Sequence, residues 1–381
     1  MDRPKKIHLL LIINIIALFC VGIVVQYSSA GGKWMPFAIH QLVVFSFFFL
    51  LAIAMSFIEI DFYLKYAYLF YIAAVTSLLL VNFFGSHIMG ATRWIRIGPI
   101  SLQPSEFAKV GLILALARYF NKQSVYKMME FQRLFKAFII IFLPVFLVLK
   151  QPNLGTAVIM LFIGASIIFT AIIKRSHLIV FGTIGILVIP TIWPFLRPYH
   201  KQRILSFLDS SVDPLGIGYN AQQSQIAIGS GGLLGKGFVN GSQTQLGFLP
   251  EKRTDFAFAV LGEEWGFLGS MVLVFLYTTL FAIIFSIAHR SRNYFSKLVS
   301  IGIFAFFGVH FAVNIGMTIG LLPVIGDPLP FLSYGGSTTA ASLICVGLLL
   351  SSITSAKDLR LSSRFYPREG PWFEIRNKKT T

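Results

Sequence analysis

Long apolar runs recur along the whole chain, and short polar segments separate them. A helix needs roughly 20 apolar residues to cross a bilayer, so each run of about this length predicts a membrane-spanning helix. The predicted spans are 7–27, 37–57, 62–83, 104–120, 135–150, 155–173, 177–195, 256–288, 298–322 and 337–356. The pattern therefore predicts an all-α polytopic membrane protein with about ten transmembrane helices.

The first span could be mistaken for a signal peptide, because Arg3, Lys5 and Lys6 precede it. Its apolar core is longer than the roughly 7–15 residues of a signal, and further spans follow it. We therefore expect an uncleaved first helix.

Basic residues divide unevenly between the loops that join the spans. If the N-terminus is cytoplasmic, the predicted inner loops hold most of the Lys and Arg residues, as the positive-inside rule requires. The short outer loops hold only Lys33, Arg93, Arg96 and Lys150. We expect both termini to be cytoplasmic, with a membrane domain over 1–356 and a basic cytoplasmic tail over 357–381.

Composition agrees with this topology. Of the 381 residues, 56% are hydrophobic and only 12% are charged, whereas soluble domains hold about 25% charged residues. The formal net charge of +17 is explained by the loops and by attraction to anionic headgroups, so nucleic-acid binding is not expected. The two cysteines lie in apolar runs and the histidines lack metal-ligand spacing, so neither a disulfide framework nor a zinc site is predicted.

One connection, about 196–255, is far longer than the others, and we place it outside the cytoplasm. Loops beyond roughly 12–15 residues are usually functional or disordered, and short amphipathic helices on the membrane surface would suit this one. Its glycine-rich run, Gly229–Gly237, fails the nucleotide-binding spacing because Gly237 stands where Ser or Thr is required. A backbone cradle for a lipid-linked pyrophosphate and a plain flexible loop both remain open.

Three carboxylates mark the start of the span that follows this loop. Asp255 stands where loop meets helix, and Glu263 and Glu264 lie within the first turns. Burying an unpaired charge in hydrocarbon is costly. A carboxylate at the outer surface can take a proton from a sugar hydroxyl or help hold a divalent cation, although Asp255 alone could also be a helix N-terminal acid favoured by the macrodipole. Glu263 lies about 12 Å deeper, which favours a supporting role.

Two further segments carry charge near the outer surface. Glu106 and Lys109 share a helix face, where they form either a self-neutralising pair or a polar cavity wall. Arg93 and Arg96 flank Trp94, which suits either phosphate binding or an interfacial anchor.

Two other polar features lie near the C-terminal end. The Pro- and Gly-rich loop Gly326–Ser337 predicts a broken helix or re-entrant segment. His310 and Asn314, one turn apart, are typical of hydrogen bonds between helices.

Taken in order, these stretches resemble the SEDS family (shape, elongation, division and sporulation). The motifs that carry the likeness are Arg93-Trp94-Ile95, Gln103–Glu106 with Lys109, Gln151-Pro152 with Leu154–Thr156, Asp213–Gly216, Gln223-Ser224, Ile226–Gly232, Leu249–Glu251, Thr254–Phe256, Gly262–Glu264 and Leu329–Ser337. They cover nearly the whole membrane region.

The resemblance implies a ten-span peptidoglycan glycosyltransferase of the bacterial inner membrane. Such an enzyme polymerises lipid II beside a class B penicillin-binding protein and other membrane proteins of the elongation complex. It also implies that Asp255 matches the essential acid and that a divalent cation, Mg²⁺ or Mn²⁺, is required, with Asp255 as a candidate ligand. Lipid II carries its own leaving group, so no nucleotide is expected.

The residues expected at the site follow from this reading. Asp255 is expected to be catalytic, and Glu263 and Glu264 to support it. The residues expected to bind substrate are Arg93, Glu106, Lys109, Arg203, Gln223, Ser224 and Ser333.

The chain departs from the family's usual pattern at three positions. Asn153 replaces the usual Asp, so a role for charge there is in doubt; Arg253 replaces His, and Ser242 replaces Thr.

Two other classes of function compete with an enzyme. A lipid II flippase or other transporter would need polar groups across the full bilayer depth, whereas the ionisable groups here cluster in the outer half and no inverted repeat is visible. A non-catalytic scaffold of the elongation complex would tolerate changes at Asp255.

Overall fold

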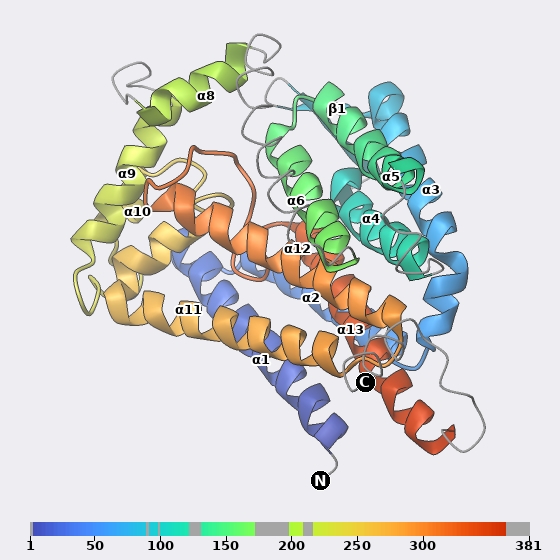
Figure 1. Cartoon of the computed structure of the whole chain (residues 1–381). Helices are drawn as coiled ribbons and strands as arrows, with labels where there is room; N and C mark the ends of the chain where they lie inside the picture. Colours follow the sequence, from blue (N-terminus) through green and yellow to red (C-terminus); the bar gives the residue numbers. More distant parts are fainter. Residues whose placement is uncertain are drawn as a thin grey trace, which may run out of the picture.

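The computed structural model describes residues 3–88, 91–97, 100–121, 131–171, 198–208 and 216–362 (Figure 1). Its longer helices are α1 (Arg3–Ser29), α2 (Phe37–Met55), α3 (Ile60–Phe84), α4 (Pro104–Asn121), α5 (Phe131–Lys150), α6 (Leu154–Ala171), α11 (Ala257–Arg290), α12 (Tyr294–Thr318) and α13 (Gly336–Ser362). Shorter helices are α8 (Pro198–Leu208), α9 (Ile217–Ser230) and α10 (Ser242–Gln245).

The helices confirm the predicted polytopic all-α class. Nine of the predicted spans coincide with helices, and the tenth, 177–195, lies outside the described residues. Within the described part of the chain, seven helices are long and apolar enough to cross a membrane, namely α1, α2, α3, α6, α11, α12 and α13. Figure 1 places the start of α1 and the end of α13 at the same end of the bundle.

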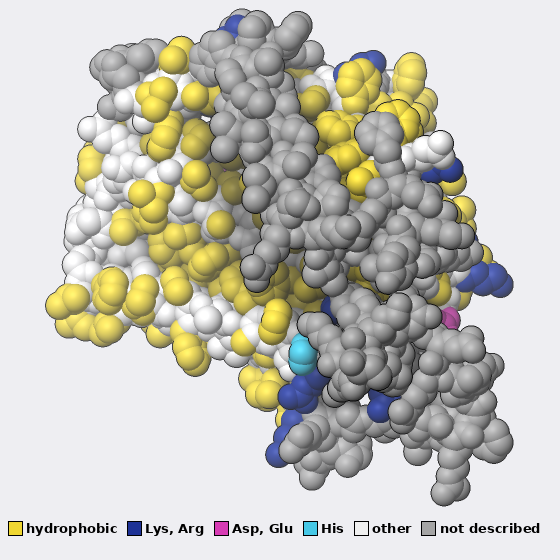
Figure 2. Space-filling view, viewed as in Figure 1, with side chains coloured by type: hydrophobic (Ala, Val, Ile, Leu, Met, Phe, Trp, Pro, Cys, Tyr) yellow, Lys and Arg dark blue, Asp and Glu magenta, His cyan; other side chains and the backbone are white. Residues whose placement is uncertain are grey.

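Apolar side chains point outward as well as inward. Phe47, Phe83 and Phe142 are 64%, 81% and 53% exposed, and Figure 2 shows hydrophobic side chains over much of the described part of one face. Exposed apolar surface on this scale would be unfavourable in water and suits a lipid environment. The centre is formed by α4, which packs against α3, α6, α12 and α13.

A small antiparallel sheet precedes α4, in a region where the hydrophobic pattern predicts only a short connection. It consists of β1 (Ser86–Ile88), β2 (Ala91–Ile97) and β3 (Ile100–Leu102), with Arg96 opposite Ser101. The alternation of Thr, Trp and Ile in β2 suits a strand, but its length is too short to stand out beside the apolar helices. The sheet fixes the course of the chain just before α4.

The long connection is more ordered than a plain loop, since it contains α8, α9 and α10. Residues 209–215, which include the predicted motif residue Asp213, lie outside the described part of the chain.

The segment 319–335, between α12 and α13, is non-helical, and residues 329–333 within it are buried. Leu329, Phe331 and Leu332 are at most 1% exposed. The Gln26 side chain of α1 donates a hydrogen bond to the Leu332 carbonyl at 3.1 Å, and a Cβ on Gly22 would lie only 2.0 Å from the Phe331 carbonyl oxygen. Irregular backbone packed inside the protein agrees with the predicted re-entrant segment.

Candidate functional site

Asp255 lies two residues before α11 and is anchored by α12. Its backbone carbonyl accepts a hydrogen bond from Asn314 Nδ2 at 3.0 Å, and the same amide donates to the Asp327 carbonyl at 2.9 Å. Asn314 therefore fixes the start of α11 against the re-entrant segment, as expected of a residue that bonds between helices.

The carboxylate of Asp255 meets Arg203 of α8 across a glycine. A Cβ on Gly326 would lie 3.1 Å from Asp255 Oδ2 and 3.7 Å from Arg203 Nη1. Gly326 also has φ +77°, a left-handed conformation that favours glycine. The guanidinium of Arg203 donates to the Ile325 carbonyl, so the cation is held beside the acid by the neighbouring backbone.

This environment makes Asp255 a weaker acid than usual. The pKa of Asp255 is raised to about 6, chiefly by burial of the carboxyl group and also by the charge of Glu251, while Arg203 and Arg93 oppose the shift. A carboxylate with a pKa close to neutral is suited to accept a proton in one step and release it in the next.

Glu106 and Lys109 form a fully buried ion pair on α4. Their charged atoms are 2.7 Å apart, and Lys109 Nζ also lies 2.9 Å from His310 Nε2 on α12. Lys109 is 0% exposed and Glu106 is 1% exposed. The pair is therefore self-neutralising, and it faces the interior of the bundle rather than lipid.

Arg93 reaches from β2 to the turn between α5 and α6. Its Nε donates to the Gln151 carbonyl at 3.1 Å, and its guanidinium also donates to the Pro152 carbonyl. Its charge lowers the pKa of both Asp255 and Asp327. The structure thus places Arg93, Lys109 and Arg203 around the same buried region.

The sequence reasoning missed Asp327, a second buried acid in this region. Asp327 is 3% exposed, and burial raises its pKa to about 7; Lys109 and Arg93 lower the value, while Glu106 and Asp255 raise it. An acid within a segment predicted to re-enter the protein was a usable signal, because a charge there must be buried.

The other residues predicted to contact substrate lie apart from the charged residues around Asp255, or form hydrogen bonds to the backbone. The Ser224 hydroxyl donates to the Thr318 carbonyl at 2.9 Å, and Ser333 Oγ accepts from the Leu329 amide at 2.9 Å. Both serines are buried, and Gln223 is half-buried on α9. These contacts favour structural roles for the two serines, and substrate contact by the three residues stays a prediction.

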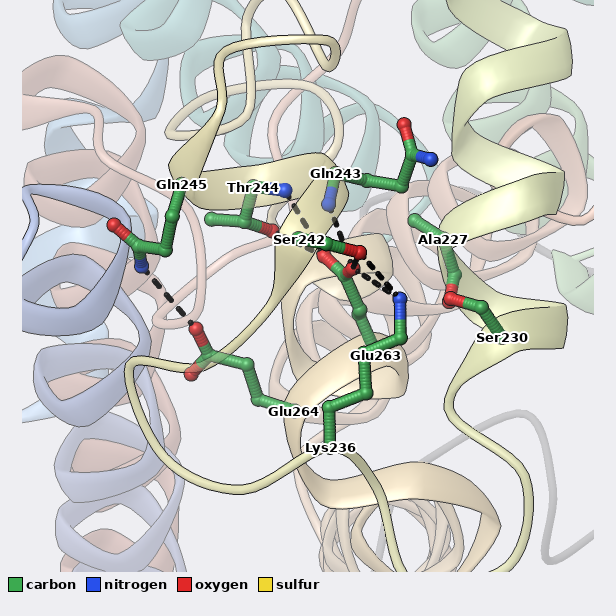
Figure 3. Close-up of polar contacts among 9 residues, drawn as sticks. All are labelled: Ala227, Ser230, Lys236, Ser242, Gln243, Thr244, Gln245, Glu263 and Glu264. Atoms are coloured by element: carbon green, nitrogen blue, oxygen red, sulfur yellow. Dashed lines mark hydrogen bonds and ion pairs between the residues drawn. The ribbon is translucent and has the colours of Figure 1, made fainter.

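Glu263 and Glu264 hold the long connection against α11, as Figure 3 shows. The Glu263 carboxylate accepts hydrogen bonds from Lys236 Nζ at 2.8 Å and from the backbone amides of Gln243 and Thr244 at 2.8 and 3.0 Å. Glu264 accepts a hydrogen bond from the Ser28 hydroxyl at 2.6 Å. These contacts agree with supporting roles for both acids.

The glycine-rich residues 231–237 form what we term the glycine strap. The amides of Lys236 and Gly237 donate to the Glu263 and Glu264 carbonyls at 3.0 and 3.1 Å, where the break in α11 at Gly266 leaves the backbone accessible. Because protein carbonyls already occupy these two amides, the amides of Lys236 and Gly237 are not free to bind a pyrophosphate. The strap is not a loose loop, since it braces the helix that follows Asp255.

The strap requires glycine at position 235, so we predict that Gly235→Ala destabilises the protein. Gly235 has φ +83°, and a Cβ there would lie 2.1 Å from the Glu264 carbonyl oxygen. Left-handed backbone at a non-glycine residue costs about 1–3 kcal/mol, and the clash adds to this cost. Thermal unfolding in detergent should show a lower midpoint.

Gly229→Ala is the matched control for this variant. A Cβ at Gly229 meets nothing within 4 Å, and alanine in a helix is favoured over glycine by about 0.5–1 kcal/mol. Its midpoint should not fall; an equal loss in both variants would contradict the role of the strap.

One hollow adjoins the site through Arg203, and a second lies among the helices. A polar cavity of about 320 Å³ lies between α8, α9 and residues 320–324, and Arg203, Ser206 and Gln225 are among the residues that line it. An apolar groove of about 550 Å³ runs between α2, α3 and α4, and Ile95, Leu102 and Pro104 close one end of it. The described residues contain no cluster of three or more metal-binding side chains.

Comparison with known proteins gives a consistent answer across nearly the whole chain. The family model described as the FtsW/RodA/SpoVE cell cycle protein matches residues 4–358. The peptidoglycan glycosyltransferase MrdB of Escherichia coli K12 is 36% identical over 372 residues, covering 95% of this chain and 99% of MrdB.

Solved structures agree. A chain of a peptidoglycan synthase complex that coordinates polymerization and crosslinking is 32% identical, with a TM-score of 0.79 over 91% of this chain and 97% of its own length. RodA of Thermus thermophilus is 27% identical, with a TM-score of 0.67 over 94% of this chain and 97% of RodA. The chain therefore belongs to the FtsW/RodA/SpoVE family, and the SEDS resemblance that its motifs indicate is confirmed.

Proposed function

We propose that this peptidoglycan glycosyltransferase polymerises lipid II with Asp255 as its general base. Asp255 takes the proton of the acceptor's sugar 4-hydroxyl, and the oxygen attacks the anomeric carbon of the growing chain. The bond to undecaprenyl pyrophosphate breaks as the new glycosidic bond forms, with inversion at that carbon. The observation that carries the proposal is the half-buried Asp255, whose carboxylate lies beside Arg203 and has its pKa raised to about 6.

Arg203 is the cation best placed for the leaving group. It lies next to Asp255 and also lines the polar cavity. A fixed guanidinium stabilises the negative charge that develops on a departing pyrophosphate. Arg93 adds positive charge from the sheet, whereas Lys109 acts within its buried pair with Glu106.

A divalent cation fits this site as a partner of the substrate. Mg²⁺ is usually held by one or two carboxylates together with substrate phosphates, and Asp255 offers one carboxylate toward a pyrophosphate. Mg²⁺ or Mn²⁺ held there would neutralise phosphate charge and polarise the leaving group. Asp255 accepts the proton of the acceptor hydroxyl whether or not a cation is bound.

The apolar groove beside β2 and β3 suits the polyprenyl chain of the substrate. Its walls come from α2, α3 and α4, and few of its lining residues are polar. If the lipid tail binds in this groove, the pyrophosphate attached to it would lie near the charged start of α4, close to Arg93 and Glu106.

The cellular setting follows from the same family. The chain is a multi-pass bacterial membrane protein, and we place it in the inner membrane with both termini cytoplasmic and Asp255 outside. The related synthase chain works in a complex that coordinates polymerization with crosslinking. That complex supports a class B penicillin-binding protein as partner here, with other membrane proteins of the elongation machinery.

Polymerisation should depend on pH through Asp255. The base must be ionised, so activity is expected to fall as pH drops through about 6, the value to which the pKa of Asp255 is raised. Since the charge of Glu251 contributes to that rise, Glu251→Gln should move the acid limb of the pH profile to lower pH. Rates of polymerisation of purified lipid II across the pH range measure this, and a limb that stays in place or moves upward would count against Asp255 as the base.

A further inference from the structure

The side chain of Asp327 lies against the first turn of α6. A Cβ on Gly155 would be 3.2 Å from Asp327 Oδ2. Within the described part of the chain, this buried oxygen has no hydrogen-bond partner. An acceptor left in this way normally costs about 1–3 kcal/mol, and more when it is charged. Such a group invites a functional explanation.

The charged groups around Asp327 come from several elements. Lys109 and Glu106 face it from α4, Arg93 from β2 and Asp255 from the start of α11. Together with Arg203, which flanks Asp255, the cations of the region are Arg93, Lys109 and Arg203, and the other acids are Glu106, Asp255 and Glu251. Asp327 therefore adds a further carboxyl group to this set, close to the first turn of α6.

Position 153 lies at the same place in the fold. Asn153 directly precedes α6, and its side-chain oxygen accepts from the Thr156 amide at 3.4 Å. This residue is neutral, so the carboxylate beside the first turn of α6 comes from Asp327. Position 153 is a second place from which a carboxylate could be supplied to the same turn. A helix N-terminus favours such a charge.

We propose that Asp327 is a positioning residue of the transferase site, which supplies from the re-entrant segment a buried carboxylate beside the first turn of α6. Its carboxylate attracts the Arg93 guanidinium and so helps to hold it beside the region where the pyrophosphate of the substrate binds. This role rests on the proposed function. Asp327 itself neither attacks nor accepts the hydroxyl proton.

A charge-exchange experiment tests this role. Polymerisation of lipid II by the full chain with its penicillin-binding partner is measured for wild type, Asp327→Asn, Asn153→Asp and Asn153→Asp/Asp327→Asn. Asp327→Asn should lower kcat by about 10–100-fold, because small errors in the position of charged groups are costly in an active site. Asn153→Asp alone should also lower activity, since it crowds two carboxylates.

The double variant separates positioning from structure. It restores one carboxylate to the first turn of α6, so its kcat should return to within about threefold of wild type, a strong coupling between two neighbouring sites. A purely structural role of Asp327 would not be rescued from position 153. A double variant no more active than Asp327→Asn would overturn the proposal, as would a fully active Asp327→Asn.

Controls keep the outcomes distinct. Asp327→Asn keeps the backbone carbonyl that Asn314 binds, and thermal unfolding in detergent verifies that each variant is folded. If Asp327→Asn alone fails to fold, a folded and active double variant still supports the exchange, and a folded but inactive one refutes it.

Glu59→Gln, at an exposed acid, should leave activity unchanged. An inactive wild type, or an active Asp255→Asn, would refute the proposed function; a failed exchange beside an active wild type and an inactive Asp255→Asn refutes only the role of Asp327.

Discussion

Asp255→Asn is expected to reduce polymerisation of purified lipid II by at least about 100-fold, the lower end of what a general base contributes. The amide keeps the shape of the side chain and cannot take the proton of the acceptor hydroxyl. Its backbone carbonyl still accepts from Asn314, so the start of α11 should keep its place.

Stability distinguishes this chemical loss from misfolding. The folded-state pKa of Asp255 is raised from 3.8 to about 6, so folding disfavours the ionised carboxylate. The free energy of unfolding therefore falls as pH rises through that value. At neutral pH a neutral asparagine should therefore unfold at the same temperature as wild type or a higher one. Glu251→Gln, on the same loop but exposed, is the matched control and should polymerise normally well above the pKa of Asp255. Near-normal activity of a folded Asp255→Asn would refute the mechanism.

Lys109→Met should produce the largest loss of stability. It leaves Glu106 buried and without the ammonium that lies 2.7 Å away in wild type. Removing one partner of a buried ion pair typically costs about 3–5 kcal/mol. Chemical or thermal unfolding in detergent should show this loss, together with loss of activity.

A double variant separates the two effects. Glu106→Gln/Lys109→Met removes both charges, so most of the stability should return, while activity should stay low because the charge balance around Asp255 and Asp327 is altered. Lys236→Met is a matched control, since it breaks another Lys–Glu pair, but Glu263 keeps bonds from Gln243 and Thr244. Lys236→Met should therefore lower the free energy of unfolding much less than Lys109→Met does. If Lys109→Met were as stable as wild type, the claim that Lys109 and Glu106 form a stabilising buried ion pair would be contradicted.

Helices could be predicted because membrane spans are local features of the sequence. The runs that become α1 and α12 are apolar for a full bilayer thickness, and no distant residue is needed to recognise them. The sheet over 86–102 was missed because its strands are short, and β propensity depends strongly on context.

The site was less predictable because it is assembled from distant segments. Arg203 and Asp255 meet over Gly326, a contact that no spacing reveals, and their grouping in the sequence analysis depended on the SEDS resemblance. The bracing role of the glycine strap was missed for the same reason, since its partners Glu263 and Glu264 lie on α11. Asp327 was overlooked because its surroundings, including Gly155 of α6, exist only in the folded chain.

The central claim is that this chain transfers a glycosyl group at Asp255 and does not merely transport lipid II or scaffold other enzymes. The most direct measurement places the purified chain and its penicillin-binding partner in liposomes with labelled lipid II and a divalent cation, without nucleotide, and follows glycan strands and movement of lipid II between leaflets together. We predict glycan strands with wild type, none with Asp255→Asn, and no scrambling with either. Scrambling without any glycan product, or product that is unaffected by Asp255→Asn, would contradict the account.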